Sequence, residues 1–131
     1  MPGDAAYLRD VIAGLGRPVV LVGHSYGGLV ITEAADGDDA VTALVYVSAF
    51  APDSGESAIE LTGRFPGSTL GETLERYELT GGGGEVRMAP SAFHRQFAAD
   101  VPADRAALMA ATQRPVTLAA LGEGLPARGS R

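Results

Sequence analysis

The sequence predicts an α/β fold of parallel strands with flanking helices, joined to a mostly helical region. Four segments carry this prediction: residues 4–15 and 29–35 have helical spacing, and residues 19–22 and 41–50 are strand-like runs of aliphatic and β-branched residues. Helices that alternate with strands are typical of parallel sheets built from right-handed crossover units. We therefore expect a partial core over residues 1–50 and a cap or lid without terminal core strands over residues 51–131.

The first predicted helix and strand are the clearest local signals. Apolar residues recur along Asp4–Leu15 at the spacing of one helix face. They are Leu8, Val11, Ile12 and Leu15. Val19–Val22 follows and is apolar on both faces, which is the pattern of a strand covered by helices on each side. This strand is expected to be central in its sheet.

A second helix and strand follow, and then the character of the chain changes. The stretch Asp36–Asp39 breaks the helix predicted over residues 29–35 before the strand predicted over Val41–Phe50. From Ala51 onward glycine and proline punctuate short segments, with no further convincing strand of parallel-sheet type. Helices are predicted at Ser57–Thr62, Ser91–Ala99, Pro102–Gln113 and Val116–Leu121.

Composition excludes several classes of function. The net charge is −6, and the ten basic residues are all arginines scattered along the chain, which disfavours nucleic acid or an anionic membrane as a partner. There is no cysteine and only two histidines, so no metal motif is recognisable. Without lysine there is no phosphate-binding P-loop, and no dinucleotide fingerprint is present. We expect a cytoplasmic protein without cofactor, metal or membrane span.

The motif Gly23-His-Ser-Tyr-Gly27 fits the pattern G-x-S-x-G of a nucleophile elbow. Chance is the competing explanation in a chain with 18 glycines, but the motif lies between a buried strand and a helix, as the mechanism requires. Ser25 is expected in strained backbone, at a cost of about 1–3 kcal/mol. The backbone N–H of Tyr26 then lies at a helix start, and one such oxyanion donor is worth about 10²–10³ in rate.

Catalytic partners for Ser25 are harder to find. His24 leaves the elbow in a different direction, so we interpret it as a packing residue, and His94 as a surface or cap residue. Asp53 is a candidate acid, but a Pro-Asp turn is the simpler interpretation. The run Gly81–Gly84 comes after the elbow, where an oxyanion loop should precede it, and is interpreted as a flexible loop.

Two stretches of sequence resemble a known family, the α/β-hydrolases. They are PVVLVGHSYGGLVITEAA and VTALVYVSAFAPDSGES, and the likeness is to bacterial serine hydrolases near the plant methylesterase and hydroxynitrile lyase branch. A weaker likeness of residues 89–100 and 109–121 to the cap of those proteins extends it over most of the chain. The resemblance implies Ser25 as nucleophile, the Tyr26 N–H as one oxyanion donor, and hydrolysis of a small apolar ester through an acyl-enzyme without a cofactor.

The same resemblance implies that parts of the mechanism lie elsewhere. The family places the second oxyanion donor before the helix that opens this chain, and the triad acid and histidine beyond the cap. Because a serine needs a base and an acid to attack at neutral pH, we interpret the chain as a central fragment of an α/β-hydrolase. Three alternatives stay open: a non-catalytic remnant that binds an apolar ligand, hydroxynitrile lyase-like chemistry on the same serine, and a complementing chain that supplies the missing strands and the His/Asp pair.

Overall fold

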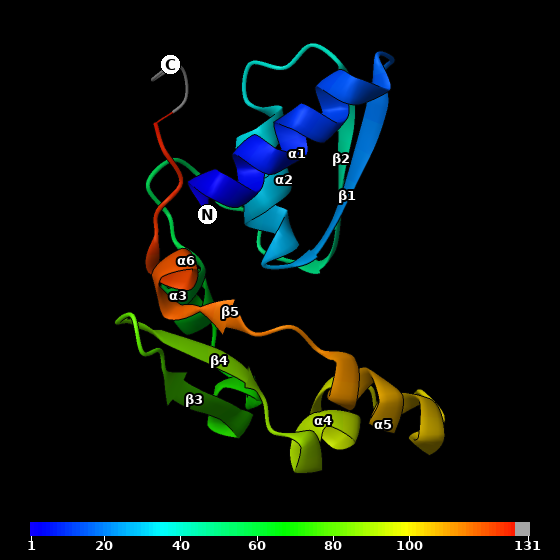
Figure 1. The fold of residues 1–131 in the computed structure, drawn as a ribbon, viewed down its shortest axis with the longest axis vertical. Helices are drawn as coiled ribbons and strands as arrows, with labels where there is room; N and C mark the ends of the chain where they lie inside the picture. The colour runs from blue at the N-terminus through cyan, green and yellow to red at the C-terminus, as the bar shows by residue number, and fades with distance from the viewer. Residues whose placement is uncertain (128–131) are drawn as a thin grey trace. The chain divides into compact units, whose positions relative to one another are not determined.

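The computed structural model describes residues 1–127, which divide into two compact units (Figure 1). The first unit contains Met1–Arg64 and the described residues from Leu121 onward, and the second contains Phe65–Ala120. This division differs from the boundary expected at residue 50. Residues 51–64 belong with the first unit, and the chain returns to that unit at Leu121.

The first unit is a two-stranded parallel sheet with helices, as predicted. Its elements are α1 (Pro2–Leu15), β1 (Val19–Ser25), α2 (Gly27–Ala35), β2 (Val41–Ala49) and α3 (Ala58–Arg64). Gly16 ends α1 in the left-handed conformation, with φ 60°. The strands β1 and β2 pair in parallel from Val19 opposite Val41. Figure 1 shows α1 and α2 on the same side of this strand pair.

One face of the sheet is buried and the other is exposed. Ile12, Leu21 and Ile31 join α1, β1 and α2 in one apolar core, against which Leu44 of β2 also packs. The opposite face, here called the valine face, carries Val20, Val22, Val45 and Val47, which are 43–64% exposed. Two expectations for β1 are therefore not met within the described residues: helices of the first unit cover one face of the strand and not both, and β1 is not central, because its sheet has two strands.

An ion pair ties α1 to the end of α2. The guanidinium of Arg9 donates to the carboxylate of Glu33 at 3.1 Å and to the Ala34 carbonyl at 3.3 Å, and it also donates to the Glu33 carbonyl. Carbonyls in the last turn of a helix lack intrahelical partners, so Arg9 satisfies groups that would otherwise be orphaned. The same contacts neutralise Glu33, which is 5% exposed.

The helix predicted at Ser57–Thr62 is present as α3 and begins with a capping box. The Ser57 amide donates to Glu60 Oε2 at 2.9 Å, and the Glu60 amide donates to Ser57 Oγ at 3.3 Å. The preceding loop binds the end of the described chain, because the Gly55 amide donates to the Leu125 carbonyl at 2.7 Å. These contacts explain why residues after Leu121 return to the first unit.

The second unit contains a sheet that the sequence did not predict. Its elements are a 3₁₀ turn η1 (Leu70–Thr73), β3 (Leu74–Glu78), β4 (Gly84–Met88), α4 (Pro90–Phe97), α5 (Ala103–Thr112) and β5 (Val116–Thr117). The strands form an antiparallel sheet in the order β3-β4-β5. The helix predicted at Val116–Leu121 begins later, as α6 (Leu118–Gly122). The helices predicted at Ser91–Ala99 and Pro102–Gln113 correspond to α4 and α5.

Of the run Gly81–Gly84, the first three glycines lie in the turn between β3 and β4, and Gly84 begins β4. Gly82 and Gly83 have φ values of 93° and 82°, which only glycine adopts readily. The Leu79 amide donates to the Gly83 carbonyl at 2.9 Å and closes the turn. The first three glycines of the run thus lie in a loop, as predicted, and its place is in a hairpin. None of the helices within residues 1–127 is long and apolar enough to span a membrane.

Candidate active site

Ser25 is the last residue of β1 and lies in strained backbone, as the motif predicts. Its φ is 51°, and Ser48 has a φ of 43°. Among residues 1–127 these two are the non-glycine residues with positive φ. A serine in the left-handed region is uncommon and is often found where function requires a particular side-chain direction. The strand therefore turns into α2 at Ser25, with Tyr26 as the helix N-cap.

Two glycines allow strand and helix to approach closely around Ser25. A Cβ atom on Gly23 would lie 2.7 Å from the Gly27 carbonyl oxygen and 2.9 Å from the Ile31 Cδ1 atom. A Cβ atom on Gly28 would lie 2.0 Å from the Phe50 carbonyl oxygen. Neither distance is compatible with a side chain unless the backbone moves. Glycine is therefore required by packing at Gly23 of the motif and at Gly28, the residue that follows the motif.

The end of β2 meets the elbow through a local change of register. His24 lies opposite Val47, but the next residue, Ser25, lies opposite Ala49, so Ser48 is an extra residue in β2. Beyond this bulge the Phe50 amide donates to the Ser25 carbonyl at 3.2 Å. The backbone of Ser25 is thus held from β2 as well as from α2.

The side chain of Tyr26 links the elbow to α1. Its hydroxyl donates to Asp4 Oδ2 at 2.7 Å. The amino group of Met1 lies 3.7 Å from the same oxygen and 3.1 Å from Glu123 Oε2. Burial raises the pKa of Tyr26 strongly, and the hydrogen bond to Asp4 and the negative charges of Asp4 and Glu123 raise it further.

The other sequence candidates are His24 of β1, His94 of α4 and Asp53 of the loop after β2. His24 is exposed and faces Val47 in the β1–β2 register, on the side opposite to the next residue along the strand. His94 belongs to the second unit, where its Nε2 lies 2.9 Å from the Val101 carbonyl oxygen. Asp53 begins a turn, because its carbonyl accepts from the Glu56 amide at 3.1 Å. The turn interpretation of Asp53 is confirmed.

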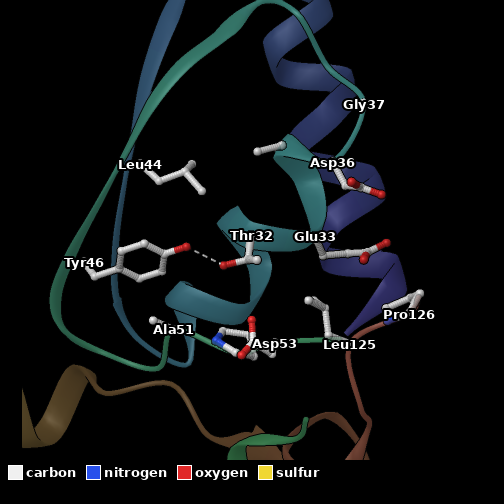
Figure 2. Close-up of a pocket in the computed structure, with 12 residues that line it drawn as sticks. Thr32, Glu33, Asp36, Gly37, Leu44, Tyr46, Ala51, Asp53, Leu125 and Pro126 are labelled. Atoms are coloured by element: carbon white, nitrogen blue, oxygen red, sulfur yellow. Dashed lines mark hydrogen bonds between the residues drawn. The ribbon is translucent and has the colours of Figure 1, made fainter. Parts of the chain in front are cut away.

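A pocket of about 450 Å³ lies in the first unit, between the carboxyl-terminal half of α2 and the loop after β2 (Figure 2). In it the hydroxyls of Thr32 and Tyr46 are 2.7 Å apart. Asp36 and Asp53 also line it, and Ser25 is not among its lining residues. Within residues 1–127 no group of three or more histidine, aspartate or glutamate side chains is placed to hold a metal ion.

Two residues that shape the elbow were not identified from the sequence. Ser48 is recognisable in retrospect as a small polar residue that follows the run Val45–Val47, but its left-handed backbone depends on the partner strand. Asp4 lies in the first turn of α1, where an acid is common for reasons unrelated to Tyr26. No sequence signal connects these two positions to Ser25.

Comparisons with known proteins agree with the fold of the chain. The model of the alpha/beta hydrolase family matches residues 2–130. A carbendazim hydrolyzing esterase from Nocardioides sp. (strain SG-4G) is 43% identical over 60 residues, covering 42% of this chain and 25% of the relative. A crystal structure of a mutant polyneuridine aldehyde esterase superposes with a TM-score of 0.71 at 20% identity, covering 93% of this chain and 53% of that chain.

The fold and the family match together identify the class of protein. The chain belongs to the alpha/beta hydrolase family. It spans about half the length of the solved relative, and the matched region is a quarter of the Nocardioides protein. Both relatives are named as esterases, and the expectation of a partial α/β-hydrolase fold is confirmed.

The close contact at Gly28 makes a direct prediction about stability. Gly28→Ala places a methyl group against the Phe50 carbonyl and should lower the free energy of unfolding by about 2–3 kcal/mol. The matched control is Gly27→Ala, because a Cβ atom there has nothing within 4 Å. The control should leave stability unchanged or raise it by up to about 1 kcal/mol. Urea unfolding followed by circular dichroism measures both, and equal losses in the two variants would contradict the packing argument.

The raised pKa of Tyr26 predicts a loss of stability at alkaline pH. The unfolded chain releases the tyrosine proton near pH 10, whereas the folded protein retains it. The stabilising contribution is therefore complete below about pH 10 and is lost as the pH rises toward the folded pKa. In an ultraviolet titration of tyrosinate, Tyr26→Phe should remove the component that ionises last.

The control for this titration is Tyr7→Phe, since Tyr7 is 72% exposed. Tyr7→Phe also removes one tyrosine from the chain, but it should leave the Tyr26 component intact. If both variants lose the same component, the environment assigned to Tyr26 is wrong.

Proposed function

We propose that Ser25 is the nucleophile of an esterase-type serine hydrolase and that the Tyr26 N–H is one donor of its oxyanion hole. The observation that carries this proposal is the φ of 51° at Ser25, at the turn from β1 into α2. A left-handed serine at a strand-to-helix turn is the geometry in which a G-x-S-x-G motif exposes its hydroxyl. The Tyr26 amide belongs to the first turn of α2, whose N–H groups have no intrahelical acceptor.

The proposed reaction is acyl transfer in two steps. Ser25 Oγ attacks the ester carbonyl carbon while a base accepts its proton, and the negative oxygen that forms is held by the Tyr26 N–H. The ester C–O bond then breaks, the alcohol leaves with the proton from the base, and an acyl-enzyme remains. Water, deprotonated by the same base, releases the acid and restores Ser25.

The proposed substrate is a small apolar carboxylic ester. The support is the esterase names of both relatives, together with membership in a hydrolase family. Serine-based acyl transfer needs no metal or organic cofactor, which agrees with the absence of a nucleotide motif in the sequence.

We infer that the base and the acid come from further polypeptide that completes the sheet, as a complementing segment or chain. Within the described residues, β1 and β2 form a sheet of two strands, so each has a neighbour on one edge alone. Two-stranded sheets are only marginally stable in water. The four side chains of the valine face are each 43–64% exposed. Added strands and helices would cover these surfaces and bring catalytic side chains to the carboxyl end of β1.

Labelling with a fluorophosphonate tests the nucleophile. We expect slow labelling of the chain at Ser25, because a serine hydrolase without its full triad retains about 10³–10⁴ of rate enhancement. Ser25→Ala should abolish the label, and Ser54→Ala, in an exposed loop, should leave it unchanged. Labelling that persists in Ser25→Ala, or is absent from the wild type, contradicts the proposal.

Two other results would favour the alternative functions. Saturable binding of an apolar ester without labelling would favour a ligand-binding remnant, and cyanide release from a cyanohydrin would favour lyase chemistry.

The inferred completion of the sheet predicts self-association of the isolated chain. Its exposed valines should make the apparent mass rise with concentration, and Val22→Lys with Val47→Lys should reduce that rise. Tyr7→Lys, on the exposed side of α1, is the control for added charge. Sedimentation and thermal unfolding measure the result. A wild-type chain that is monomeric and unfolds cooperatively would contradict the inference.

A further inference from the structure

A second strained serine lies beside Ser25, on the neighbouring strand. Ser48 has a φ of 43° and is the extra residue at the second of the two register shifts between β1 and β2. Its side chain is exposed. Left-handed backbone in the middle of a strand is unfavourable for any residue with a Cβ atom. Such strain persists only when the surrounding structure requires it.

The bulge changes which backbone groups reach the elbow. With regular pairing Ser48 would lie opposite Ser25, and every following residue of β2 would be displaced by one position. With the bulge, Ala49 lies opposite Ser25 and the Phe50 amide donates to the Ser25 carbonyl at 3.2 Å. The Phe50 carbonyl oxygen is also placed where a Cβ atom on Gly28 would lie only 2.0 Å from it. A one-residue slip would exchange the donor and acceptor directions of these contacts.

We propose that Ser48 is a positioning residue that sets the direction of the Ser25 side chain through the backbone of Ala49 and Phe50. This proposal rests on the proposed role of Ser25 as nucleophile. Ser48 does not contact the reacting atoms. Its left-handed conformation places Phe50 against the turn at two points, Ser25 and Gly28. These contacts hold the turn in the conformation that exposes the Ser25 hydroxyl.

The choice of side chain at position 48 follows from this geometry. Glycine adopts a positive φ without strain, so Ser48→Gly should preserve the bulge. A β-branched residue is least compatible with that region and most compatible with a regular strand, so Ser48→Val should remove the bulge. Val45→Ile is the control, because it adds a methyl group to a β-branched residue at an exposed position of β2 that pairs with Val22 in regular register.

Two measurements on the full chain test the proposal. Hydrogen exchange of the Phe50 amide reports its bond to the Ser25 carbonyl, and the rate of fluorophosphonate labelling reports the placement of the Ser25 hydroxyl. Ser48→Val should raise the exchange rate at Phe50 by about tenfold or more. It should lower the labelling rate by up to about 100-fold, the effect of a displacement near 1 Å in a reacting group. Ser48→Gly and Val45→Ile should keep both rates within about twofold of wild type.

Each outcome decides one of two questions. If the wild type is labelled and Ser48→Val leaves the exchange rate at Phe50 and the labelling rate at their wild-type values, the positioning role of Ser48 is wrong. If Ser48→Gly raises the exchange rate at Phe50 and lowers the labelling rate as Ser48→Val does, the serine side chain itself is required, and the proposal is again wrong. If the wild type is not labelled, the nucleophile role of Ser25 fails, while exchange at Phe50 still decides whether the bulge holds the turn. Ser48→Ala, a smaller perturbation, replaces Ser48→Val if that variant does not fold.

Discussion

The contact between the end of β2 and the first turn of α2 is the constraint on which the first unit depends. Phe50 can approach α2 only because Gly28 has no side chain, and the same approach lets the Phe50 amide bind the Ser25 carbonyl. Three elements therefore meet at one short turn. The strain at Ser25 is maintained by contacts on both sides of it, so the serine has little freedom to relax into ordinary strand geometry.

The helix α1 secures α2 at both of its ends. At the amino-terminal end Asp4 accepts the hydrogen bond of Tyr26, and at the carboxyl-terminal end Arg9 binds Glu33 and the last carbonyls. Both contacts are polar: the Arg9 bonds are partly buried and the Tyr26–Asp4 bond is exposed. Ile12 of α1 also packs with Ile31 of α2 in an apolar core. Polar contacts are directional, so this arrangement fixes the position of α2 along its own axis more firmly than apolar packing alone.

Sequence patterns predicted the first unit well because its signals are local. The aliphatic run of β1, the helical spacing of α1 and the motif around Ser25 each identify an element without reference to the rest of the chain. The sheet of the second unit escaped prediction because β3 is exposed at every position and has no apolar alternation. It is held by cross-strand pairs such as Glu75 with Arg87, at 3.1 Å. The bulge at Ser48 escaped prediction because register belongs to a pair of strands.

The second unit is a continuous segment, 65–120, placed between two parts of the first unit. The first unit closes on itself through backbone bonds of Gly55 and Glu56 with Leu125, on either side of that segment. Inserted segments of this kind can change in length and sequence while the host retains its connectivity. Segment 65–120 can then change without altering the turn at Ser25, since the backbone contacts that hold this turn, from Phe50 and Gly28, lie wholly outside the inserted segment.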